Sequence, residues 1–232
     1  MKRTIALIAA MVLALGILPA FAAGSIETTE ETWYVVSHSD DYRVYYYAVV
    51  ANNADKPMSI NDLLFQIQDA EDNTIESTAK YKLYPEVLEA GQTGWLVISK
   101  DVKDIDNKSD IDHYLLTITS KTNDDKVTHA LPATAEFIEK DEDDNENVIR
   151  ATVTNEGSEN AFEITIAAAA RDAEGKLLYI ASDATKDIGL PAGSQLMLRS
   201  LIKTDLTDEW EDTHVTVASA EAMAYTVEDI DD

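Results

Sequence analysis

The sequence predicts an all-β protein, made of two tandem immunoglobulin-like antiparallel β-sandwich domains after a signal peptide. Three observations lead to this prediction. The N-terminal residues have the charge and hydropathy pattern of an export signal. Apolar residues in the rest of the chain recur with the period of two that is typical of strands. The chain also repeats itself at an offset of 103 residues, which places Asn52 against Asn155.

Residues 1–22 are typical of a secretory signal peptide. Lys2 and Arg3 give a positive start, and residues 5–18 are apolar and uncharged. Residues 20–22 (AFA) then offer the small side chains that a signal peptidase requires. The apolar run is shorter than the roughly 20 residues of a membrane-spanning helix. We therefore expect a secreted protein in the extracellular or cell-wall space, with no membrane span in the mature chain.

No anchor is expected either. The chain has no cysteine, whereas a bacterial lipoprotein needs one directly after its cleavage site. Without disulfides, each domain must be held together by its core. Residues 190–194 (LPAGS) are similar to a sortase signal, but they have glycine where that signal needs threonine, and no hydrophobic tail follows.

The charge of the chain excludes one class of partner. It has 44 acidic and 18 basic residues and a net charge of −26. Residues 1–22 carry two basic residues and no acidic one, so the mature chain is at −28. Such a chain repels nucleic acid and anionic lipid, and it lacks the basic surface of a nucleic-acid binder. Weak binding of divalent cations is compatible with this charge.

The internal repeat keeps its order along the chain. Its matching segments are 48–52 with 151–155, 69–71 with 172–174, 88–91 with 190–193, and 112–115 with 212–215. A period this long exceeds the roughly 20–50 residues of a solenoid unit and is that of a whole domain. We expect domains at 26–132 and 133–232, with the boundary near 132–135. The acidic run 141–147 lies opposite 37–44, so we expect it to form a loop after the first strand of the second domain.

Strands are predicted where β-branched and aromatic residues gather between turn signals. The clearest runs are 42–47, 113–119, 148–154 and 214–218. Residues 164–170 and 177–180 predict a hairpin, in which Gly175 is free to take a positive φ. Short helical turns are expected within 100–110 and 205–212. Many short strands with turns between them favour an antiparallel sandwich.

Residues 65–73 (FQIQDAEDN) and 88–91 (LEAG) resemble the FxLYD-type domains of exported proteins from Gram-positive bacteria. The second copy keeps Asp172, Gly175 and the turn at 190–193. It has Ala168 and Ala170 where the pattern has Phe and Leu, and both copies lack its Tyr. The resemblance implies an immunoglobulin-like β-sandwich and no known activity.

Seven residues of these repeated motifs are expected to be structural and not to form a site. They are Asn52, Asp69, Gly91, Asn155, Asp172, Gly175 and Gly193. An aspartate at the start of a hairpin turn accepts hydrogen bonds from backbone N–H groups a few residues later, and this fixes the turn.

No catalytic motif is present. The chain lacks cysteine, a G-x-S-x-G elbow, an HExxH motif and a glycine-rich phosphate loop. His113 and His214 fall at matching places of the two copies, so we expect each to belong to a different domain and not to share a site. We expect no enzymatic activity, no cofactor and no metal. With 44 acids, a carboxylate-based glycoside hydrolase is still an alternative.

Calcium binding is a second alternative, in the form of a calcium-dependent adhesion module. Residues 104–112 have alternating acids, and residues 141–147 are rich in oxygen ligands. However, Lys108 takes a ligand position, and the glycine and closing glutamate of an EF-hand are missing.

The leading prediction for function is a secreted, non-catalytic binding or structural-interaction protein, whose partner is a protein or glycan at the cell exterior. Tyr45 and Tyr47 lie on one face of a strand, with Tyr46 on the other. Exposed aromatic side chains of this kind stack on sugars or peptides, although packing in a core is their commoner role.

Overall fold

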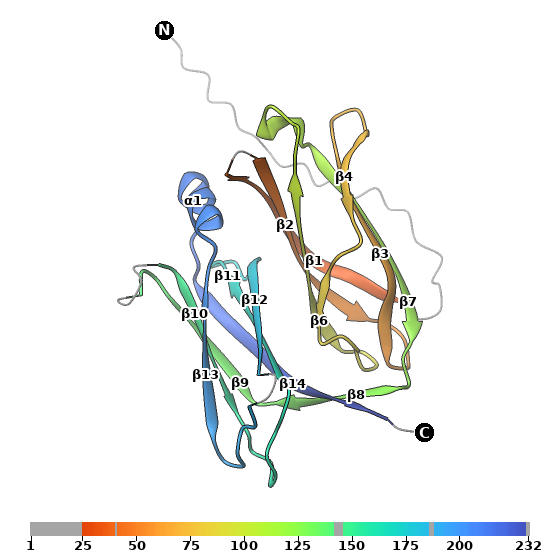
Figure 1. Cartoon of the computed structure of the whole chain (residues 1–232), viewed down its shortest axis with the longest axis vertical. Helices are drawn as coiled ribbons and strands as arrows, with labels where there is room; N and C mark the ends of the chain where they lie inside the picture. The colour runs from red at the N-terminus through yellow and green to blue at the C-terminus, as the bar shows by residue number, and fades with distance from the viewer. Residues whose placement is uncertain (1–24, 40, 142–145, 186–187, 231–232) are drawn as a thin grey trace.

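The computed structural model describes residues 25–39, 41–141, 146–185 and 188–230. The predicted all-β fold is confirmed: four antiparallel sheets form two β-sandwiches (Figure 1). The strands are β1 (Ile26–His38), β2 (Asp41–Asn52), β3 (Met58–Gln68), β4 (Thr74–Thr78), β5 (Lys82–Tyr84), β6 (Thr93–Val102), β7 (His113–Thr122), β8 (Lys126–Leu131), β9 (Ala133–Ile138), β10 (Val148–Thr154), β11 (Ile164–Arg171), β12 (Leu177–Thr185), β13 (Gln195–Leu201) and β14 (Ser219–Asp229).

The two sandwiches have the same strand order. In the first, sheet β1-β2-β6-β5 packs on sheet β4-β3-β7. In the second, β9-β10-β13 repeats β1-β2-β6, and β12-β11-β14 repeats β4-β3-β7. An isolated bridge also recurs, between Met58 and Leu88 in the first copy and between Ala161 and Leu190 in the second. This shared topology agrees with the repeat seen in the sequence.

The first core is aromatic at its centre. The ring of Tyr46 lies 5.3 Å from that of Phe65 and 5.1 Å from that of Tyr114. Tyr46 is fully buried, and its hydroxyl donates to Oε2 of Glu31 at 2.7 Å. Burial and this neighbouring carboxylate raise the pKa of Tyr46. The alternation of strand β2 therefore places Tyr46 between the two sheets, as its period predicts.

Strand β11 is buried on both faces. Its four alanines, 167–170, are each less than 5% exposed, and the strand runs between β12 and β14. One face of β11 points into the second core, and its other face is also buried. At the four alanines, both faces therefore have room only for small side chains. The predicted hairpin of β11 and β12 is confirmed, with Gly175 at a φ of +82°.

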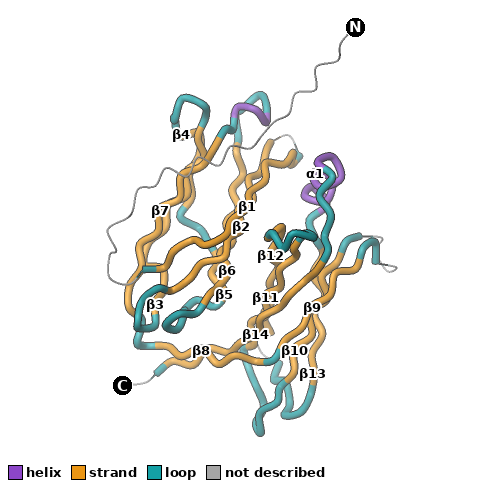
Figure 2. The backbone as a smooth tube through the Cα atoms, turned by 180° about the vertical axis from the view of Figure 1, so that it is seen from behind, coloured by secondary structure: helices purple, strands orange, loops and turns teal. Residues whose placement is uncertain are grey.

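The chain crosses between the sandwiches earlier than the expected boundary at 132/133. Strand β8 lies before that boundary, but it pairs with β14 in the second sandwich. In Figure 2 it runs along the base of the molecule from β7 to the second sandwich. The physical reason is the edge of β14, with which β8 forms its backbone hydrogen bonds. Pro132 follows β8, and after it the chain changes sheets and β9 pairs with β10.

The predicted strand at 214–218 is wrong. Helix α1 (Thr204–Thr213), which buries Leu206 and Trp210, ends just before this segment; residues 214–218 form a turn and irregular chain, and β14 begins only at Ser219. His214 caps the helix in a left-handed conformation with a φ of +58°, whereas His113 begins strand β7. The two histidines are therefore not equivalent, because α1 is longer than the 3-10 helix at Lys108–Asp110 in the first copy. No helix among the described residues is long and apolar enough to cross a membrane.

Candidate binding groove between the sandwiches

The two sandwiches share a packed interface. The outer face of sheet β1-β2-β6-β5 presents Tyr45, Tyr47 and Trp95 to the second sandwich, where they join its hydrophobic core. The ring of Tyr47 lies 5.3 Å from that of Tyr179, edge to face. Burial raises the pKa of Tyr47 above its ordinary value. Tyr45 and Tyr47 thus share a face, as predicted, and that face is an interface within the chain.

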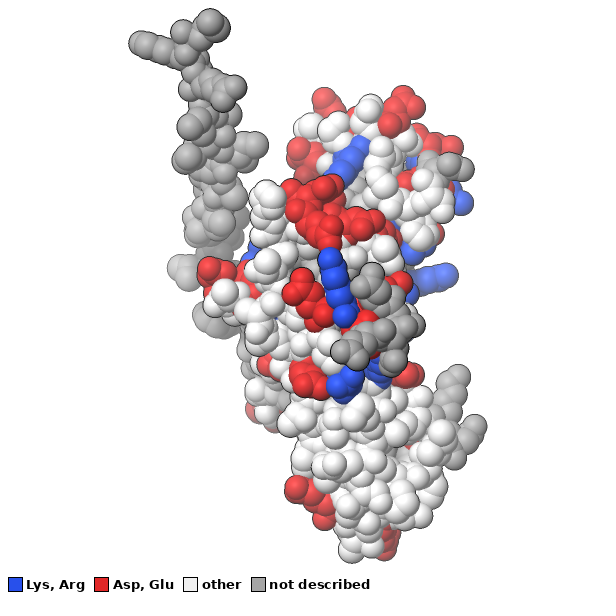
Figure 3. Space-filling model, turned by 90° about the vertical axis from the view of Figure 1, so that its left-hand side faces the viewer, with Lys and Arg blue, Asp and Glu red and all other residues white. Residues whose placement is uncertain are grey.

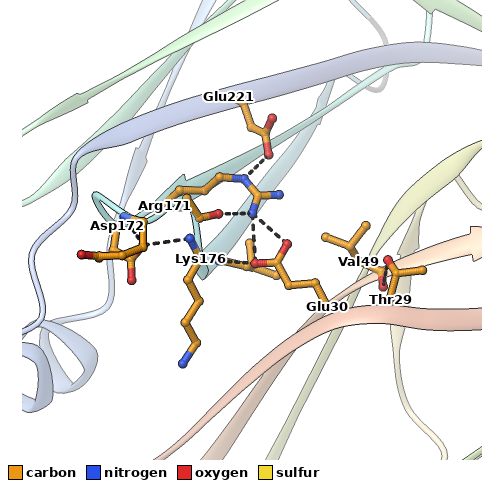
Figure 4. A network of polar contacts seen from close by, with 10 residues as sticks. Thr29, Glu30, Val49, Arg171, Asp172, Lys176 and Glu221 are labelled. Atoms are coloured by element: carbon orange, nitrogen blue, oxygen red, sulfur yellow. Dashed lines mark hydrogen bonds and ion pairs between the residues drawn. The ribbon is translucent and has the colours of Figure 1, made fainter.

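An ion-pair network ties the interface at one end (Figure 4). The carboxylate of Glu30 on β1 accepts two hydrogen bonds from Nη1 of Arg171 on β11, at 2.8 and 3.1 Å. Glu30 also accepts from the backbone N–H of Leu177. Arg171 in turn donates from Nε to Glu221 at 2.6 Å. Because these bonds join elements of both sandwiches, they fix the two sandwiches relative to each other.

Helix α1 ties the interface at the other end. The carboxylate of Asp205 lies 3.3 Å from Nδ1 of His38 and accepts a hydrogen bond from the hydroxyl of Tyr45 at 3.2 Å. Nearby, Nζ of Lys108 lies 2.6 Å from Oε2 of Glu209. The sandwiches are thus joined by polar contacts on both sides of the aromatic centre.

Two adjoining cavities lie along this interface. One has a volume of about 700 Å³ and the other of about 650 Å³. They share four lining residues: Tyr81, Lys82, Tyr84 and Ser182. The hydroxyl of Tyr84, on the first sandwich, lies 2.5 Å from Oγ of Ser182, on the second. We call the 650 Å³ cavity the basic groove and the 700 Å³ cavity the side cavity.

The basic groove takes its walls from both sandwiches. Its floor consists of the buried tyrosines 45, 47, 84 and 179. Lys80 and Lys82 line it on the first sandwich, and Arg199 and Lys203 line it on the second. All four of these basic residues are exposed. The arrangement can hold a ligand between the two repeats.

The charge of the basic groove is opposite to that of the chain. Among the residues that the structure describes, its lining includes four basic residues and no aspartate or glutamate. Elsewhere acids dominate, and Figure 3 shows them gathered over the upper part of one face of the molecule. Among the described residues, Lys80, Lys82 and Lys203 form no ion pair, while Arg199 lies 3.4 Å from Asp141.

The predicted structural asparagines do not line either cavity and are buried in their own copies. Nδ2 of Asn52 donates to the carbonyls of Lys56, Leu88 and Glu89, at 2.8, 2.8 and 3.0 Å, and Oδ1 accepts from the N–H of Ala54. In the second copy, Nδ2 of Asn155 donates to the carbonyls of Glu159 and Leu190, and Oδ1 accepts from Gly157. Each asparagine holds the loop after its strand against the later turn.

The predicted turn aspartates also make matching contacts. Oδ1 of Asp69 accepts from the N–H groups of Glu71 and Asn73, and Oδ1 of Asp172 accepts from those two and four residues later. The hydrogen bonds with Asn73 lower the pKa of Asp69. Gly91 and Gly193 both have a φ above +70° in the turns that close on the two asparagines.

The calcium hypothesis concerned residues 104–112 and 141–147. Residues 142–145 lie outside the described part of the chain. Asp141 is 5% exposed and lies 3.4 Å from guanidinium nitrogens of both Arg150 and Arg199, so its carboxylate is already engaged by cations. Within the described residues, no group of three or more His, Cys, Asp or Glu side chains is placed to hold a metal ion.

The basic groove was not predicted from the sequence. One local signal was available: residues 80–84 (KYKLY) interleave lysines with tyrosines in an otherwise acidic chain. The opposite wall, at 199–203, lies more than a hundred residues away, and no sequence pattern links the two segments.

No protein-family model, curated protein or solved structure matches this chain.

Proposed function

We propose that this is an exported, non-catalytic binding protein that holds its ligand in the groove between its two sandwiches. The observation that carries this proposal is the lining of the basic groove, to which both repeats contribute. Polar contacts at both ends of the interface pre-form the groove. A pre-formed site loses little conformational freedom on binding, and this favours affinity.

The chemistry of the groove supports binding more than hydrolysis. A glycoside hydrolase needs two carboxylates flanking the scissile bond. Within the described ranges the basic groove has no carboxylate in its lining, and the side cavity has Glu86 and Asp183. Lysines, tyrosine hydroxyls and serines, in contrast, can recognise a ligand without transforming it.

An array of glycans and protein ligands, probed with the mature chain, tests this proposal together with one pair of variants. Ser99 is exposed on β6 and lines the basic groove, so Ser99→Trp should fill the groove and leave the core intact. Thr117→Trp places the same bulk on an exposed site of β7, away from both cavities.

We expect array ligands to bind the wild type and Thr117→Trp at equal strength and to be lost with Ser99→Trp. Ligands that bind Ser99→Trp as well as the wild type would place the site elsewhere. Release of a shortened product from a bound glycan would show an enzyme.

A further inference from the structure

We propose that the ligand of the basic groove is an acidic glycan, a carbohydrate chain that carries carboxylates. This inference rests on the proposed function, because it names the ligand class of the same site. It is argued from the charge of the groove, from the placement of that charge on two walls, and from the hydroxyl groups between them.

The charge of the groove departs from that of the chain. Acids outnumber bases more than twofold, 44 to 18, yet four bases and no acid of the described residues line this groove. Arg199 pairs with Asp141, whereas Lys80, Lys82 and Lys203 have no carboxylate partner within the described part of the chain. A concave site with apolar walls strengthens the attraction of such charges for an anion, because the walls exclude water.

The cations are spread over two walls. Lys80 and Lys82 belong to the first sandwich and Arg199 and Lys203 to the second, with the tyrosine floor between them. The side cavity continues the site through Tyr81, Lys82, Tyr84 and Ser182. It adds Lys121 and Lys126 to the lining together with Glu86 and Asp183, and Lys126 lies 3.9 Å from Asp229. One small anion cannot meet cations on both walls and in both cavities. A chain with a carboxylate on successive units can do so.

The remaining lining favours a carbohydrate over an acidic peptide. Serine hydroxyls from both sandwiches, at 99, 182 and 200, accompany the tyrosine hydroxyls. A hydroxyl both donates and accepts hydrogen bonds, which matches the hydroxyls of a sugar. Val97, Ile180 and Ala181 provide apolar surface for the faces of sugar rings.

The test measures binding of three carboxylated glycans by calorimetry: oligogalacturonate, oligomannuronate and hyaluronan fragments. Fully methyl-esterified oligogalacturonate, which keeps the sugar and loses the charge, is the matched neutral probe, and oligoglutamate represents the acidic peptide. We expect at least one acidic glycan to bind, about tenfold or more above the neutral ester, and to weaken as sodium chloride rises.

Two double variants with the same net charge locate the effect. Lys80→Glu with Lys82→Glu reverses one wall of the groove and should weaken binding about tenfold or more, since two attractions become repulsions. Lys56→Glu with Lys103→Glu changes two exposed lysines that line neither cavity and should leave the affinity within about twofold.

Each other outcome overturns the inference. These are no binding of any of the three acidic glycans, equal binding of the neutral ester, equal loss in both double variants, and tighter binding of oligoglutamate than of every glycan. The proposed function fails separately. If a neutral array ligand is blocked by Ser99→Trp while no acidic glycan binds, the groove remains the site and only its ligand class is wrong.

Discussion

Replacing Asn52 with alanine should lower the free energy of unfolding by about 4 kcal/mol. The side chain is fully buried and makes four hydrogen bonds to backbone groups. A net hydrogen bond contributes about 1 kcal/mol, and the buried groups left behind would be unsatisfied. Asn155 makes three such bonds, so Asn155→Ala should cost less, about 3 kcal/mol.

The aspartate variant separates hydrogen bonding from packing. Asn52→Asp keeps the size of the side chain and the acceptor for Ala54, but it turns a carboxylate towards three carbonyl oxygens. It should therefore destabilise the protein more than Asn52→Ala at neutral pH. The control is the neighbouring residue, Asn53. Asn53→Ala removes an exposed hydrogen bond to Glu27 and should change the free energy of unfolding by less than about 0.5 kcal/mol.

Urea unfolding followed by tryptophan fluorescence measures these differences. Trp33 reports on the first sandwich, Trp95 on the interface between the two and Trp210 on the second. A loss below about 1 kcal/mol for Asn52→Ala, or wild-type stability in Asn52→Asp, would refute the reasoning, because either result means that the backbone groups find other partners.

Four further predictions concern turns, interface and ions. Asp172→Ala should cost about 1 kcal/mol in urea unfolding, as for a lost cap, and an unchanged midpoint would contradict its role in the turn. Because folding lowers the pKa of Asp69, its carboxylate stabilises the protein above the unfolded pKa of about 3.8, and this stability is lost as the pH falls through the folded value. The difference in urea midpoint between wild type and Asp69→Ala should therefore disappear in acid. A difference that persists in acid would contradict this role of the carboxylate. Glu30→Ala should destabilise the protein by about 1–3 kcal/mol in the same assay, since Arg171 loses a partner at the interface; a neutral result would mean that this network holds nothing. Ions should act by screening alone: the melting temperature should rise with sodium chloride, because screening relieves the self-repulsion of a chain at −26. Calcium should raise it no more than magnesium at equal ionic strength, since arginines already engage Asp141, and a flat or falling salt curve or a calcium-specific rise would refute this prediction.

Much of the fold was predictable because its signals are local. The period of two in β2 placed Tyr46 opposite Tyr45 and Tyr47, since successive side chains of a strand point to opposite faces. The hairpin at Asp172 follows from turn chemistry that needs only a few adjacent residues. Repeated motifs also marked Asn52 before any contact was known.

The predictions were wrong where one local sequence pattern is compatible with two different structures. Residues 214–218 alternate like a strand. However, helix α1, which buries Trp210, continues to Thr213, and β14 begins only at Ser219. The sequence pattern of strand β8 is that of an edge strand and does not indicate its partner. Its pairing with the edge of β14 places it in the second sandwich.

The sequence by itself determined the strands, the turns and the duplication, because each depends on backbone geometry over a few residues or on the comparison of two segments. Only the tertiary structure decided what covers the outer face of β2 and where the scarce basic residues gather. Periodicity reports that a face is buried but not what buries it. Lys80 and Lys203 come to one groove solely because the two sandwiches pack through Tyr47 and Tyr179, and that contact is set by shape and burial between segments more than a hundred residues apart.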